Sequence, residues 1–155
     1  MKLAGQHILP ASQDVVWRAL LDPDVLARTL PGCESLDPVG PDAYRMRMKL
    51  AIASVQGLFD GKVSITEQDP PHSYRLNVEG RGKIGFVNGG GVLRLEPSGS
   101  GGESPATLVH YDGEVKVGGM IASVGQRLLD MTSKMMIRRF FSALASEITA
   151  GAGAL

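Results

Sequence analysis

The sequence predicts an α+β domain in which a curved antiparallel sheet of six or seven strands wraps around one long C-terminal helix. The chain has 155 residues, which is about the size of one domain. After Gly32 and up to about residue 117, apolar side chains recur at every second position, and from 119 to 149 they recur at every third or fourth. We expect a single domain over residues 1–150 and a short flexible tail over 151–155.

The N-terminal segment predicts an edge strand followed by two short helices. Residues 2–9 form the strand, which ends at Pro10. Ser12 then offers an N-cap oxygen to the first helix. Asp22-Pro23 ends this helix and begins the second, because proline is well tolerated in a first helical turn. Pro31-Gly32 ends the second helix, so two short helices are expected between the first two strands.

The middle of the chain predicts strands that are apolar on one face only. Met46 and Met48, for example, alternate with the charged side chains of Arg45 and Arg47. This alternation is typical of an antiparallel sheet with one wet face. Turn signals at Gly40-Pro41, Asp69-Pro70-Pro71 and residues 99–105 separate the runs. The alternating segments are 44–52, 60–67, 73–80, 91–97 and 107–118.

The last segment predicts a helix over about 119–149. Nearly 30 residues in a helix span about 45 Å, which is enough to cover the concave face of the sheet. Its apolar residues have helical spacing and fall into two groups, the second on a rotated face: Ile121, Val124, Leu128, Met131 and Met135, then Ile137, Phe141, Leu144 and Ile148. The order of strand, two helices, about six strands and long helix is that of the helix-grip fold.

Composition excludes several classes of function. The 16 basic residues balance the 16 acidic ones, so the charge excess of a nucleic-acid-binding protein is missing. The single Cys33 cannot form an internal disulfide, and no Cys/His cluster has the spacing of a zinc site. The N-terminus has no apolar core of a signal peptide, and no apolar run reaches the ~18 residues of a membrane span. We expect a soluble, cytoplasmic protein.

Gly80, Gly82 and Gly85 form a literal GxGxxG pattern. A dinucleotide site needs a helix directly after this loop, but residues 86–97 are strand-like and include three consecutive glycines. We therefore expect a glycine-rich hairpin in a strongly bent sheet. Alternatively, Gly89, Gly90 and Gly91 leave volume inside the curve of the sheet that a ligand could occupy.

The titratable residues do not form a catalytic pattern. Cys33 has no histidine nearby in sequence and is expected to be a small buried side chain. His72 is expected in a turn and His110 on the wet face of its strand, whereas His7 could point either way. No Ser/His/Asp or paired-carboxylate arrangement falls on the inward faces. These observations argue against an enzyme.

Two groups of residues have both a structural and a functional interpretation. The methionines, such as Met120 and Met136, are either ordinary core or the wall of an adaptable apolar pocket. The basic side of the last helix, flanked by exposed parts of Phe140 and Phe141, is either a solvated face or a contact for an acidic partner or anionic lipid. Its basic residues are Arg127, Lys134, Arg138 and Arg139. The candidate pocket residues are Met48, Leu50, Phe59, Leu76, Val78, Phe86, Val124, Leu128, Met131 and Met135.

Short motifs along almost the whole chain form a set that can be compared with known families. The most specific is Leu30-Pro31-Gly32-Cys33-Glu34. The others are Val16-Trp17, Leu20 to Pro23, Gly57 to Val63, Glu79 to Gly82 with Gly85-Phe86, Val117 to Gly119, Gly125 to Leu128, and Phe140-Phe141. Together these motifs resemble those of the carbon monoxide dehydrogenase G-subunit family. That family belongs to the helix-grip (SRPBCC) superfamily of START-like and birch-allergen-like proteins.

This resemblance implies an accessory role beside a molybdenum hydroxylase such as aerobic carbon monoxide dehydrogenase. It also implies association with the inner face of the cell membrane and an apolar cavity suited to an isoprenoid quinone. We accordingly expect a non-catalytic carrier, with menaquinone as the most plausible ligand and transient membrane contact. Two alternatives remain open: a cyclase- or hydratase-type enzyme on the same fold, and an assembly factor with a filled core.

Overall fold

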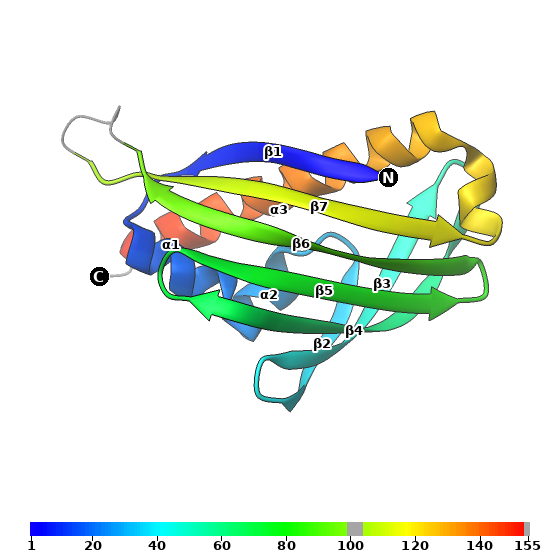
Figure 1. The fold of residues 1–155 in the computed structure, drawn as a ribbon, viewed down its shortest axis with the longest axis horizontal. Coiled ribbons are helices and arrows are strands. Elements are labelled where there is room, and N and C mark those ends of the chain that lie inside the picture. Colours follow the sequence, from blue (N-terminus) through cyan, green and yellow to red (C-terminus); the bar gives the residue numbers. More distant parts are fainter. Residues whose placement is uncertain (99–103, 154–155) are drawn as a thin grey trace.

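The computed structural model describes residues 1–98 and 104–153 and contains one antiparallel sheet and a long C-terminal helix (Figure 1). Part of the predicted turn at 99–105 lies outside the described residues. The elements in chain order are β1 (Lys2–Leu9), α1 (Gln13–Leu20), α2 (Pro23–Thr29), β2 (Cys33–Gly40), β3 (Ala43–Ile52), β4 (Val55–Asp69), β5 (Ser73–Gly82), β6 (Gly85–Pro97), β7 (Thr107–Gly118), the 3₁₀ turn η1 (Met120–Val124) and α3 (Gln126–Gly153).

The sheet has seven strands in the order β1-β7-β6-β5-β4-β3-β2. Every neighbouring pair is antiparallel, and α3 lies along one face of the sheet (Figure 1). This arrangement confirms the predicted helix-grip fold class. No helix follows Gly85, which lies at the start of β6 with a φ of 136°. The GxGxxG pattern is therefore a hairpin between β5 and β6, as expected, and not a nucleotide-binding loop.

The first short helix begins at its predicted cap, Ser12, and the second begins at Pro23 as predicted, with Asp22 as its N-cap. The Ser12 side chain accepts a hydrogen bond from the backbone N–H of Val15. The Asp22 carboxylate accepts from the N–H groups of Asp24 and Val25, directly before the helical Pro23. Both caps satisfy N–H groups that have no partner inside the helix.

The predicted helix over 119–149 is wrong at its start. Residues 120–124 form the η1 turn, and Gly125 has a φ of 97°, which interrupts the helix. Because α3 begins only after this break, the apolar spacing does not continue from Ile121 and Val124 into the helix. Leu129 is the inward residue, at 7% exposure, whereas Leu128 and Met131 are 38% and 58% exposed. At its other end α3 reaches Gly153, inside the segment expected as a tail.

Two clusters of buried side chains pack between the sheet and the helices. The larger one joins α1, the sheet and the C-terminal half of α3, and includes Val16, Val109 and Leu144. The smaller one lies around η1 and the start of α3 and includes Ile121 and Leu129. Along β6, Leu95 belongs to the larger cluster and Val87 packs against the smaller one. The glycines 89–91 lie between them.

Candidate ligand-binding slot

Two adjoining apolar hollows lie between the sheet and α3, and we call them together the slot. Their volumes are about 280 Å³ and about 240 Å³. Each alone is below the ~300 Å³ at which ligand pockets usually begin, but they share wall residues and together exceed that value. The shared residues are Leu3, Val87, Val115 and Ile137. The assembly-factor alternative expected a filled core, whereas this part of the core has space.

Glycines on β6 and β7 explain why no side chains fill the slot. A Cβ atom on Gly89 would lie 2.5 Å from the carbonyl oxygen of Glu114, and one on Gly91 would lie 2.7 Å from that of Asp112. A Cβ atom on Gly113 would meet the carbonyl oxygen of Gly90 at 2.6 Å. β6 and β7 therefore approach each other so closely here that only glycine fits at these positions. No side chains project from these positions to fill the space below β6 and β7.

Nearly parallel rings form one end of the slot. The ring centroids of His7 and Phe141 are 4.4 Å apart with an interplanar angle of 19°. Tyr111 lies 6.0 Å from both rings, at angles of 15° to His7 and 21° to Phe141. Phe140 meets Phe141 edge-on at 5.1 Å. Of these rings, Tyr111, Phe140 and Phe141 line the slot, and His7 stacks on Phe141.

The two polar rings at this end, His7 and Tyr111, are uncharged at neutral pH. Burial lowers the pKa of His7, which favours the neutral imidazole. Burial also raises the pKa of the Tyr111 hydroxyl, so this group remains a hydrogen-bond donor. Its ring lies over Gly5, where an added Cβ would be 2.5 Å from the hydroxyl oxygen. His7 is half-buried, and its ring points inward, toward Phe141 and Tyr111.

Three of the ten predicted pocket residues line the slot: Leu50, Leu76 and Val78. Met48 and Phe59 are instead buried core, and Val124 packs against the smaller cluster. Met135 is half-buried and does not line the slot.

Phe86 and two helix residues are placed differently from the prediction. The ring of Phe86 covers Gly118, and Phe86 alternates with the slot residue Val87, so it lies on the opposite face of the sheet. Leu128 and Met131 are exposed because of the break at Gly125.

Slot residues that the sequence did not single out come mostly from strands near the edge of the sheet. Leu3 on β1, Val87 on β6 and Val115 on β7 come together only through the pairing of these strands. The inward alternation of Tyr111 and Val115 was visible in the sequence. Their position beside the glycines depends on the strand register, which alternation alone does not determine.

The predicted basic residues Arg127, Lys134, Arg138 and Arg139 are all exposed on α3. Helical spacing places Arg127, Met131, Lys134 and Arg138 on one side, so an exposed apolar residue lies among the basic ones. The expectation that Phe141 is exposed is wrong, because it is 5% exposed and packs in the larger cluster. Phe140 is half-buried.

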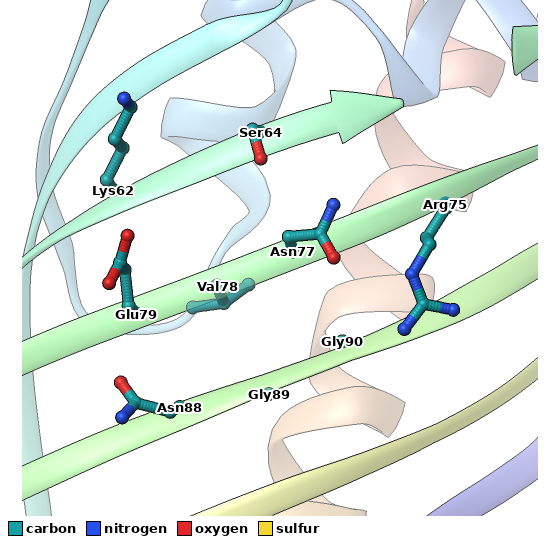
Figure 2. A pocket seen from close by; sticks show the side chains of 9 residues that line it. All are labelled: Lys62, Ser64, Arg75, Asn77, Val78, Glu79, Asn88, Gly89 and Gly90. Carbon is teal, nitrogen blue, oxygen red and sulfur yellow. The ribbon is translucent and has the colours of Figure 1, made fainter. Parts of the chain in front are cut away.

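A separate hollow, of about 510 Å³, lies on the face of the sheet opposite to the slot (Figure 2). Lys62, Arg75 and Glu79 project around Gly90, together with Asn77 and other polar side chains. The amide of Asn77 donates a hydrogen bond to the Thr66 hydroxyl. This polar hollow does not suit an apolar ligand, so the candidate site is the slot.

The other two histidines and the cysteine lie outside the slot. The His110 ring is 2.9 Å from the Glu96 carboxylate, and their hydrogen bond lowers the pKa of exposed Glu96. His72 lies at the surface beside Gln13, and burial raises the pKa of the Cys33 thiol, which keeps it a poor nucleophile. Within residues 1–98 and 104–153, no three His, Cys, Asp or Glu side chains are grouped to hold a metal ion.

A comparison with family models matched residues 5–149 to the G subunit of carbon monoxide dehydrogenase (CoxG). The chain belongs to the CoxG family. This confirms the resemblance of the sequence motifs. A search of curated proteins returned no match. Family membership and fold together support an accessory or ligand-binding role.

Solved structures share the fold of this CoxG-family chain. A conserved protein from Geobacillus kaustophilus is 35% identical with a TM-score of 0.90, covering 97% of this chain and 96% of that one. A START superfamily protein from Mycobacterium smegmatis is 12% identical, with a TM-score of 0.71 and coverage of 96% and 97%. The Zhui aromatase/cyclase from Streptomyces sp. R1128 is 14% identical, with a TM-score of 0.65 and coverage of 96% and 93%. The last two show the fold alone.

No helix in the described part of the chain is long and apolar enough to span a membrane.

Proposed function

We propose that this CoxG-family chain is a non-catalytic carrier of a lipophilic ligand, an isoprenoid quinone such as menaquinone. It would serve an aerobic carbon monoxide dehydrogenase or a related molybdenum hydroxylase. The observation that carries the proposal is the apolar slot between the sheet and α3, which the glycines of β6 and β7 keep free of side chains. Family membership supports the accessory role.

The two ends of the slot suit the two parts of a quinone. The rings of Tyr111 and Phe141 offer flat faces to a planar head group, since aromatic rings favour offset stacking. The Tyr111 hydroxyl, protonated at neutral pH, would donate a hydrogen bond to a quinone oxygen. The isoprenoid chain would lie along Val87, Val115 and Ile137, with a gain of roughly 25 cal/mol for each Å² of apolar surface buried.

Transfer of such a ligand requires contact with the membrane or with the partner enzyme, because a quinone does not leave a bilayer for water unaided. The exposed basic side of α3 is the surface we assign to this contact. Each basic residue near an anionic leaflet contributes about 1 kcal/mol, so Arg127, Lys134 and Arg138 would hold the protein weakly and reversibly. The exposed Met131 among them adds apolar contact.

A cyclase-type enzyme would use the same slot differently. It would need an acid or a base at the reacting atoms. The titratable residues that line the slot are Tyr111 and Asp112, and the neutral His7 ring stacks at the same end. The Asp112 side chain is exposed and alternates with the inward Tyr111, so it points to the other face of the sheet. The other two inward tyrosines do not line the slot: Tyr44 is buried core, and Tyr74 packs edge-on against Trp17. A carrier releases its ligand unchanged, whereas a cyclase changes the covalent structure of the ligand.

The test combines native mass spectrometry with a variant that fills the slot. Protein purified from its own host should carry a quinone, and the mass of the bound ligand should match that of the free quinone. Val87→Phe should weaken binding of a short-chain menaquinone analogue about tenfold or more, because Val87 lines both hollows. The control is Leu58→Phe, at a residue that is 44% exposed. Equal affinity in wild type and Val87→Phe would exclude the slot as the binding site, and an altered ligand mass would favour the enzyme.

A further inference from the structure

We propose that β1 is a self-association edge, through which two copies of this chain pair their sheets into one continuous sheet. β1 forms one border of the sheet, and the described residues add no strand beyond it (Figure 1). The inference rests on the free backbone groups of β1 and does not depend on the proposed ligand.

The hydrogen bonds of β1 show which of its backbone groups are free. Met1 exchanges both of its backbone hydrogen bonds with Val115, at 2.9 Å each. In an antiparallel pair, hydrogen-bonded residues alternate with residues whose N–H and C=O groups point away. The β1–β7 register is unbroken from Lys2 to Leu9, so the alternation continues along the strand. The residues with outward N–H and C=O groups are therefore Lys2, Ala4, Gln6 and Ile8, all of them exposed.

The two edges of the sheet differ in how they are protected. Natural edge strands usually carry charges, prolines or bulges that prevent pairing with another chain. β2 has all three: acidic Glu34 and Asp37, Pro38, and irregular register between Cys33 and Ser35 and again between Pro38 and Gly40. β1 has no proline and no bulge, and its only charged side chain is at its first residue. This difference indicates that β1, unlike β2, can pair with a strand of another chain.

The free edge of β1 is complementary to itself. When two copies are paired antiparallel about a two-fold axis at Gly5, Lys2 faces Ile8 of the other copy and Ala4 faces Gln6. All of these residues have outward backbone groups, so each pair can exchange both hydrogen bonds. The two Lys2 side chains lie at opposite ends of the paired strands, so no like charges meet. Gly5 faces its counterpart at the closely spaced centre, where it adds no bulk.

Self-pairing also covers an exposed apolar side chain. Ile8 is 61% exposed and belongs to the outer face of the sheet, in register with Leu108. In the paired sheet, the aliphatic part of Lys2 from the other copy lies against Ile8. This contact accounts for a large apolar residue at a position that otherwise faces water.

The first test measures the mass of the full chain in solution over a range of concentrations by sedimentation velocity. We expect a monomer–dimer equilibrium. Ala4→Pro should abolish dimer formation, because proline lacks the outward N–H that the partner strand needs. Pairing with β7 is kept, since the Ala4 N–H does not bond to β7. Ile8→Lys should raise the dimer dissociation constant about tenfold or more, because it sets a lysine opposite Lys2. Leu58→Lys, which removes an exposed apolar residue elsewhere, should leave the equilibrium unchanged. Circular dichroism would confirm that each variant folds.

Hydrogen exchange distinguishes β1 from any other contact surface. On concentration, the amides of Ala4, Gln6 and Ile8 should become protected, while those of Leu3 and Gly5, already bonded to β7, should not change. A wild-type chain that stays monomeric up to about millimolar concentration would overturn the proposal. So would a dimer that Ala4→Pro leaves intact, or exchange at the outward amides that does not depend on concentration.

Discussion

The most direct check of the helix register compares two adjacent leucines at the start of α3. Leu129 is 7% exposed and packs in the smaller cluster with Ile121, whereas Leu128 is 38% exposed. Truncation of a buried leucine to alanine costs about 2–5 kcal/mol, depending on the cavity that remains. Because Leu129 already borders the slot, fewer contacts are lost, and we expect a cost in the lower part of this range, about 2–3 kcal/mol.

Leu128→Ala should cost much less. Its side chain is already partly in water and has no part in either cluster of buried residues, so we expect a loss below about 1 kcal/mol. For a chain of this length, each kcal/mol shifts the melting temperature by roughly 2–4 °C. Leu129→Ala should therefore lower it by about 4–12 °C and Leu128→Ala by less than about 4 °C.

Urea unfolding of the three proteins measures both differences. The dependence of the free energy on urea should keep the same slope, which shows that only stability has changed. Equal losses, or a larger loss for Leu128→Ala, would mean that the helix continues in phase from Ile121 and that the interruption at Gly125 has no effect on packing.

Three further predictions concern a buried hydroxyl, pH and the membrane. Thr107→Val should cost about 1–3 kcal/mol in urea unfolding, since the fully buried Thr107 hydroxyl donates to the Ala11 carbonyl at 2.8 Å. Burial lowers the pKa of His7 in the folded state, so the unfolded chain binds a proton first as the pH falls below about 6.5. The free energy of unfolding should therefore decline below this pH, and it should decline less in the His7→Phe variant. In flotation assays, anionic liposomes should bind the protein at 0.1 M salt and lose it at 1 M, where the Debye length shrinks from about 10 to about 3 Å. Charge reversal at Lys134 and Arg138 should abolish the binding, and a protein that ignores these liposomes at low salt would contradict the membrane contact.

The strands were predictable from the sequence because alternation with a period of two directly encodes which face is buried. Tyr44 and Met48 alternate with exposed arginines, and the structure buries both. The Ser12 cap and the start of the second helix at Pro23 were also predictable, because both signals act within a few residues of the chain. Local chemistry is sufficient where an element depends on its own residues.

The start of α3 and the walls of the slot were not predictable from such patterns. The spacing of Ile121, Val124 and Leu128 suits a helix, and only the positive φ of Gly125 shows that the backbone turns between them. The slot requires Leu3 and Val115 to lie beside Val87, which depends on the register of three strands. A residue's own neighbours in sequence contain no information about that register.

The proposed binding slot lies beside the larger buried cluster, whose most deeply buried residues do not line it. Val16, Val109 and Leu144 are fully buried, belong to the larger cluster beside α1 and do not line the slot. Because the glycines of β6 and β7 lack side chains, the space beneath them stays unfilled. The buried cluster beside α1 can therefore stabilise the fold while the neighbouring slot stays open. A carrier needs this arrangement, because it has to remain folded in the interval between releasing one ligand and binding the next.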